Sequence, residues 1–212
     1  MSQTREKQVE RSVDSLQKIY AVVVALAITE AVKALVLNRP SATFATMAQV
    51  VERAPAFLSF LLVVVPFYHG MNRHLDFCYI EHDRAPKALL GDFVAFFLES
   101  CILFWIANSI GPGLRPFVAL GVLLLVDSIW AWVSLRIDRE SVSATVKAWS
   151  INNIVALTIG AVVGLLVRSE VDLWLLELVF IRTVIDYEIS WKFYFPPKAE
   201  ATPSPTAEAS AA

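Results

Sequence analysis

The sequence has few cysteines and few charged residues, and both shortages exclude classes of protein. Cys78 and Cys101 are the only cysteines in 212 residues, so no disulfide framework or zinc-knuckle pattern can form. Charged residues make up 18% of the chain, against ~25% in soluble domains. The 18 Lys and Arg residues stand against 20 Asp and Glu residues, and the resulting net charge of −2 offers no basic surplus. We therefore expect no nucleic-acid partner, since such partners require a basic surface.

Short catalytic motifs are also missing. The sequence contains no GxSxG, no Walker lysine loop, no HExxH and no GxGxxG. The two cysteines do not form a CxxC pair, which leaves a redox role without support. We therefore predict no catalytic residues and no cofactor, and we expect that the protein is not an enzyme.

Long apolar segments are what the sequence has in abundance. Hydrophobic residues make up 57% of the chain, against ~45–50% in average proteins. A membrane-spanning helix needs ~20 mostly apolar residues, and continuous runs favour helices over the alternating strands of a barrel. The sequence predicts an all-α polytopic membrane bundle of six transmembrane helices at residues 19–37, 56–72, 88–110, 117–133, 151–167 and 171–189. Every proline except Pro66 falls outside these segments, and Pro55 is assigned to a connection.

Basic residues are distributed unevenly between the two sides of this predicted bundle. If the N-terminus is cytoplasmic, the Lys and Arg residues on the outer side are only Lys33, Arg39, Arg53, Arg115 and Arg168. The positive-inside rule then places both termini in the cytoplasm, as in a multi-pass protein of a bacterial inner membrane. We divide the chain into a cytoplasmic segment (1–18) leading into the first helix, a transmembrane domain (19–195) and a disordered Pro/Ala-rich cytoplasmic tail (196–212).

Polar side chains interrupt the apolar segments, mostly in the half predicted to be cytoplasmic. Because ionisable groups at membrane depth are costly, each needs a partner, a cavity or a function. One interpretation is an ion pathway or cavity, and the other is a network of structural ion pairs. In either case we expect a carboxylate on a neighbouring helix to neutralise Arg182, with Asp127 the first candidate and Asp92 the second. The candidate residues are His69, Arg73, Asp76, Asp92, Glu99, Asp127, Asn152, Asn153, Arg182 and Asp186. In the outer half, Glu30 and Lys33 are spaced to pair with each other.

The second predicted helix ends in a polar stripe. His69, Arg73 and Asp76 follow i, i+4, i+7 and therefore share one helix face. We predict that this face points inward, toward Asp92, at the inner mouth of a polar cavity. Pro66 loosens the backbone nearby, and His69 would make the site sensitive to pH.

All three histidines lie between residues 69 and 82. His69 and His74 are five residues apart and so do not share a helix face as a ligand pair would. No tight zinc signature is present, and we predict no metal site. The connection at residues 73–87 is expected to form a cytoplasmic hairpin, with His82 in it, that is a candidate docking site for a protein partner.

The first hundred residues resemble the prokaryotic TMEM175-type potassium channels. Arg11 and the Tyr20–Ala21 step match the spacing of the arginine and the aromatic–alanine step in the first helix of that family. The segment PFYHGMNRHLDF is similar to the histidine-containing end of its second helix. Leu16–Gln17 stands where the family has the Ser-Asp of its Phe-Ser-Asp motif, so the selectivity residues of the family transfer to no position here. The resemblance implies a six-helix channel.

Three functions are therefore considered. The first is a cation or proton channel, or an ion-coupled transporter, with a carboxylate- and histidine-lined cavity in the cytoplasmic half. A homo-oligomer is expected if it is a channel, because one unit of six short helices makes a narrow pore. The second is a non-catalytic membrane subunit or scaffold whose buried charges are structural ion pairs. A membrane-embedded enzyme is the third.

Overall fold

Six helices form an antiparallel bundle in the computed structural model, which describes residues 3–38, 41–137, 144–167 and 170–196. The predicted all-α class is confirmed, with one two-stranded antiparallel pair added to it. The elements are α1 (Gln3–Val36), β1 (Leu37–Asn38), β2 (Thr43–Phe44), α2 (Met47–Leu75), the π-helix η1 (Asp76–Glu81), α3 (Pro86–Ser109), α4 (Arg115–Ile137), α5 (Ala144–Leu166) and α6 (Val171–Tyr194).

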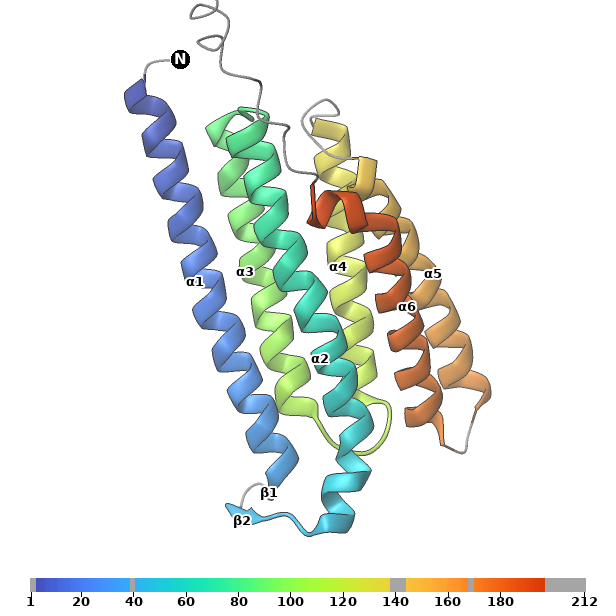
Figure 1. Cartoon of the computed structure of the whole chain (residues 1–212). Helices are drawn as coiled ribbons and strands as arrows, with labels where there is room; N and C mark the ends of the chain where they lie inside the picture. Colours follow the sequence, from blue (N-terminus) through green and yellow to red (C-terminus); the bar gives the residue numbers. More distant parts are fainter. Residues whose placement is uncertain (1–2, 39–40, 138–143, 168–169, 197–212) are drawn as a thin grey trace, which may run out of the picture.

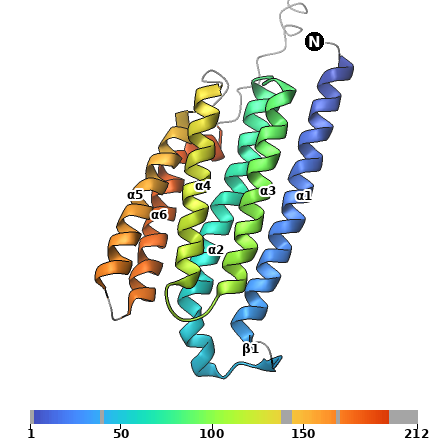
Figure 2. The same ribbon diagram turned by 180° about the vertical axis from the view of Figure 1, so that it is seen from behind.

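The helices pack as a ring in which α2 lies toward the middle. Around the ring, α1 contacts α3, α3 contacts α4, and α4 contacts α5. The ring closes because α5 contacts α6, α6 contacts α2, and α2 contacts α1. Figures 1 and 2 show this arrangement from two sides. We call the half of the bundle where α1 begins and α6 ends the proximal half. The distal half holds the β1–β2 pair and the α3–α4 and α5–α6 connections (Figure 1).

Five of the helices are long and apolar enough to cross a bilayer. These are α1 to α5, with η1 continuing the second span to Glu81. Many large apolar side chains are exposed on the outside of the bundle, among them Leu165, Leu90 and Phe97, as expected of a surface that faces lipid. The sixth helix differs in composition, because α6 carries Asp172, Glu177, Arg182, Asp186, Glu188 and Lys192. The chain is therefore a multi-pass helical membrane protein.

The second helix begins earlier than predicted, and Pro55 lies inside it rather than in a connection. Its start is set by a capping box: the Thr46 hydroxyl accepts from the Gln49 amide at 3.4 Å, and the Gln49 side chain accepts from the Thr46 amide at 2.9 Å. The predicted start lay later in the chain because Glu52 and Arg53 are charged and were not counted in the apolar segment. The segment at 1–18 leads into the first helix as expected, because α1 is already helical from Gln3. The predicted tail lies almost entirely outside the described residues.

Arg53 ties the distal end of α1 to α2. Its Nη1 donates to the carbonyl oxygens of Ala34, Leu35 and Leu37 at 3.0, 3.4 and 2.9 Å, and its Nη2 donates to Asn38 Oδ1 at 2.6 Å. Carbonyls at the end of a helix have no partner within the helix, and a cation there also meets the negative end of the helix dipole. The predicted Glu30–Lys33 pair is confirmed nearby, with Lys33 Nζ 2.8 Å from Glu30 Oε1.

Candidate functional site

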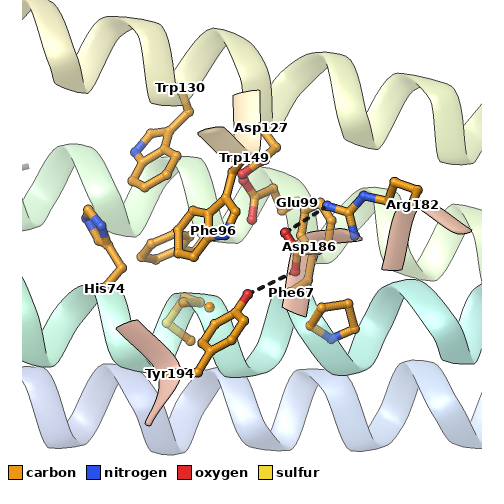
Figure 3. Close-up of a pocket in the computed structure, with 13 residues that line it drawn as sticks. Phe67, His74, Phe96, Glu99, Asp127, Trp130, Trp149, Arg182, Asp186 and Tyr194 are labelled. Atoms are coloured by element: carbon orange, nitrogen blue, oxygen red, sulfur yellow. Dashed lines mark hydrogen bonds and ion pairs between the residues drawn. The ribbon is translucent and has the colours of Figure 1, made fainter. Parts of the chain in front are cut away.

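A small polar cavity lies inside the proximal half of the bundle (Figure 3). It encloses about 30 Å³. A cavity needs roughly 10–15 Å³ to hold one water molecule, so this one has room for about two. Five helices line it, contributing Pro66, Phe67, Gly70, Met71, His74, Phe96, Glu99, Asp127, Trp130, Trp149, Arg182, Asp186 and Tyr194.

Arg182 is held on one side of this polar cavity by an amide. Its Nε and Nη2 both donate to Asn153 Oδ1, at 3.1 and 2.7 Å, and Asn153 Nδ2 in turn donates to Asp127 Oδ2. The carboxylate that pairs directly with Arg182 is Asp186, one turn along the same helix, with 3.8 Å between Nη2 and Oδ1. Asp127, the first predicted partner on a neighbouring helix, interacts with Arg182 through Asn153, which stands between the two charges. Asp92, the second predicted partner, belongs to a different cluster.

The same network continues toward the proximal end of α6. The Tyr194 hydroxyl donates to Asp186 Oδ2 at 3.0 Å, and Figure 3 shows Arg182, Asp186 and Tyr194 linked in a row. A side chain at Gly70 would meet Tyr194 Oη at 3.4 Å, so this glycine allows α2 to approach α6 closely. Asn152 supports the network by donating from Nδ2 to the Arg182 carbonyl at 3.1 Å. Polar groups thus run without interruption from Tyr194 to the carboxylate of Asp127.

Glu99 is the least satisfied group in the polar cavity. It is 2% exposed, and its Oε1 accepts no hydrogen bond from any described residue. It interacts electrostatically with Asp127 and Asp92, which have the same charge when ionised. Leaving a buried acceptor unpaired costs ~1–3 kcal/mol, and more for a charged group. The polar cavity is thus lined by three carboxyl groups, those of Glu99, Asp127 and Asp186, and by one guanidinium group, that of Arg182.

Asp92 lies outside the polar cavity and is saturated with donors. Its Oδ2 accepts from Tyr79 Oη at 2.6 Å and from Arg84 Nη1 at 3.1 Å, and His74 Nε2 lies 3.4 Å from the same oxygen. Its Oδ1 accepts from Trp130 Nε1 at 3.2 Å. We call these five residues the Asp92 cluster. They join α2, η1, the following loop, α3 and α4, so Asp92 acts here as a buried link between elements.

The predicted stripe on α2 does not point toward Asp92. His69 stacks on Tyr194 with ring centroids 4.4 Å apart, which places it against α6. Arg73 Nε donates to the Phe193 carbonyl at 2.7 Å, whereas Asp76 accepts from Gln17 Nε2 of α1 at 2.9 Å. The contact with Asp92 that was expected of this stripe is made by His74, which lies on another face of the same helix.

The connection at residues 73–87 is more ordered than a hairpin loop. Helical structure continues through η1 to Glu81, and a bidentate ion pair between Arg73 and Glu81 spans it. His82 packs its ring on Phe77 with centroids 4.0 Å apart. A π-helix is rare and is frequently found at functional sites, and this one carries Tyr79 of the Asp92 cluster.

Cys78, His74 and Asp92 follow one another in space, but they do not form a usable nucleophile, base and acid. Cys78 Sγ lies 3.7 and 3.6 Å from the two ring nitrogens of His74, and the second of these nitrogens is also the one that faces Asp92. A catalytic base instead takes a proton from the nucleophile on one nitrogen and is oriented through the other. Cys78 is also fully buried and lines no cavity that we identify in the described chain. Among described residues no group of three His, Cys, Asp or Glu side chains could hold a metal ion.

Sequence reasoning missed several residues of the Asp92 cluster and of the lining of the polar cavity. His74, Tyr79, Arg84, Trp130 and Tyr194 were not among the candidates, although all are buried or line the polar cavity. Tyrosine and tryptophan count as hydrophobic in the composition of the chain. The one available signal was that each carries a polar group that needs a partner when buried.

Comparisons with known proteins found no relative of this chain: no family model, no curated protein and no solved structure matches. The class of protein therefore follows from the molecule itself. It is a multi-pass helical membrane protein with buried ion pairs in the proximal half of its bundle.

Proposed function

We propose that this protein moves protons or small cations across a bacterial cell membrane, as a channel or an ion-coupled transporter. The observation that carries the proposal is the buried imbalance of charge around the polar cavity. Glu99, Asp127 and Asp186 bring three carboxyl groups to a space in which Arg182 is the one Lys or Arg among the described lining residues. Ionised together they would leave two uncompensated negative charges at membrane depth. A bound proton or cation removes that excess, and residues of this kind within membrane helices mark ion pathways.

The size of the polar cavity limits what can pass. Room for about two water molecules suits a proton, or one ion that has lost most of its water, and excludes an organic solute. The row from Tyr194 through Asp186 and Arg182 to Asn153 supplies polar groups along the polar cavity, starting at the proximal end of α6. We expect α6 to be a sixth span and both termini to be cytoplasmic, so that the polar cavity opens toward the cytoplasm.

Reconstitution tests the proposal directly. Purified protein is placed in liposomes that contain a pH-sensitive dye, and flux is followed under imposed proton, potassium and sodium gradients. Glu99→Gln should lower the flux by at least ~10-fold, since the variant loses a charge that the ion must meet. Glu177→Gln is the matched control, because Glu177 is a carboxylate of α6 that is exposed and does not line the polar cavity. Parent flux no greater than that of empty liposomes, or equal flux in parent and Glu99→Gln, would count against transport.

A structural scaffold is the second candidate, and the Asp92 cluster favours it. Four donors surround one carboxylate there, which is how a buried charge is neutralised to hold helices together. In that case the segment at 73–87 would bind a partner protein, and no flux would appear. The resemblance to TMEM175-type channels supports the first candidate, and a homo-oligomer would then be detected by mass measurement in detergent.

A further inference from the structure

A second, larger cavity occupies the distal half of the bundle. It has a volume of about 480 Å³ between α4, α5 and α6, is also lined by Val63 of α2, and opens to the bundle surface at the exposed residues Val118, Leu125 and Leu165. Among the described residues its walls are apolar side chains and the three glycines Gly121, Gly160 and Gly164, with Arg182 as the single charged residue. We call it the apolar cavity. Along α5 it extends from Leu165 to Ala156, roughly 14 Å at the rise of an α-helix.

Arg182 is the only described residue that lines both cavities. It is 4% exposed, and it is fixed by Asn153 and Asp186 from the side of the polar cavity. Its Nη1 has no hydrogen-bond partner among the described residues, and the centre of its guanidinium lies 5.6 Å from the Phe67 ring centroid. The two cavities therefore meet at one buried cation, and together they extend through much of the length of the bundle.

We propose that the ion crosses within a single chain, between α2, α4, α5 and α6, and that Arg182 is the barrier residue where the polar cavity meets the apolar cavity. The inference rests on the proposed function and adds the route and the barrier to it. No second copy of the chain is needed to complete the route.

Two physical effects make this junction a barrier. Cavities lined by apolar groups stay dry, and hydrophobic constrictions stop ions because water leaves them. The guanidinium adds repulsion toward any cation that arrives from the distal side. At one wall of the apolar cavity α4 and α5 approach closely, since a side chain at Gly121 would meet Leu157 Cδ1 at 3.1 Å. The ion passes when the apolar cavity fills with water and Arg182 moves aside toward its carboxylates.

The route is tested by filling the apolar cavity. Ala161 and its neighbour Val162 are both exposed, but Ala161 lines the apolar cavity and Val162 does not. Ala161→Phe should lower liposome flux by at least ~10-fold by obstructing the passage, and Val162→Phe should leave it within about twofold. Thermal melts in detergent verify that both variants are folded. A conducting parent in which Ala161→Phe conducts like Val162→Phe would overturn the route while leaving the proposed function intact.

The barrier is tested by changing the charge at Arg182. Arg182→Gln should raise flux by roughly tenfold or more, because the repulsion is removed, and Arg182→Lys should stay near the parent. A folded Arg182→Gln protein with parental or lower flux would overturn the barrier role. Should Arg182→Gln fail to fold, Leu124→Asn in the wall of the apolar cavity takes its place. That variant should raise flux by admitting water, and unchanged flux would equally overturn the barrier. A parent that conducts no better than empty liposomes would overturn the proposed function and the route together.

Discussion

Arg182 and Asp127 lie on different helices and are joined through a single amide. Asn153 accepts two hydrogen bonds from the guanidinium with its oxygen and donates to the carboxylate with its nitrogen. An asparagine side chain suits this place because it offers an acceptor and donors at once. It lets opposite charges on α4 and α6 stabilise each other without direct contact.

Removing this amide should destabilise the bundle. Asn153→Ala leaves both Arg182 and Asp127 without their shared partner, and we expect the free energy of unfolding to fall by roughly 2–4 kcal/mol. Thermal melts in detergent measure the change. Thr158→Ala, a change of an exposed residue on the same helix, should cost less than ~0.5 kcal/mol. Equal melting temperatures for the two variants would show that the bridge contributes nothing.

The Asp92 cluster should respond in a graded way. Asp92→Ala removes the buried carboxylate that lies 3.1 Å from Arg84 Nη1 and should cost ~3–5 kcal/mol. Tyr79→Phe removes one hydrogen bond to a charged group, and ~1.5–3 kcal/mol is expected. Chemical unfolding in mixed micelles measures the free energy of unfolding of each variant. The exposed pair of Lys18 and Asp14 provides the control, since Asp14→Asn should change stability by at most ~1 kcal/mol. A Tyr79→Phe protein that loses more than Asp92→Ala would contradict this order.

Arg53 should protect the distal end of α1. Arg53→Lys keeps the charge but loses the planar fork that reaches several carbonyls, so lysine should not restore the contacts. We expect faster amide hydrogen exchange at residues 33–38 in both Arg53→Lys and Arg53→Leu, measured by mass spectrometry. Glu52→Gln alters the adjacent exposed residue and should leave exchange unchanged. If amide hydrogen exchange at residues 33–38 were as slow in Arg53→Leu as in the parent, Arg53 would not be what stabilises the end of α1.

Cysteine labelling should reveal which side each end of the bundle faces. In a Cys101→Ser background, the remaining Cys78 is fully buried. A membrane-impermeant thiol reagent added to intact cells should label Thr43→Cys, at the distal end, and should reach Asp83→Cys only after the membrane is opened. Both sites are exposed, so both must react in opened cells. Labelling of Asp83→Cys in intact cells would reverse the predicted orientation.

The helices could be predicted because apolar length is a local property of the sequence. Segments of the required length identified every helix of the bundle, and spacing alone identified the Glu30–Lys33 pair. Asp92 and Glu99, seven residues apart, share one face by helical spacing, and both are buried. Local rules reach this far because they depend only on positions along one helix.

The partners of those buried groups could not be predicted. Asp92 and Glu99 share a face of α3, yet one meets four donors and the other has an oxygen with none among the described residues. The difference depends on how α4 and η1 are rotated against α3, and that rotation arises from packing between helices. For the same reason, the histidine that contacts Asp92 is His74 and not the predicted His69. A π-helix after Leu75 also shifts the register of the chain, and helical spacing counted from His69 does not include such a shift.

The composition of α6 bears on how the protein is made. Charged residues near the centre of a lone helix oppose its entry into lipid by ~2.5–3.5 kcal/mol each. Arg182 reaches Asn153 of α5, and through it Asp127 of α4, only after those helices are in place. The last helix of the chain is therefore also the one that depends most on its predecessors, and we expect it to join a bundle already assembled around its position. Biogenesis would then proceed in two stages, with early helices recognised by their own hydrophobicity and the final one retained by complementarity.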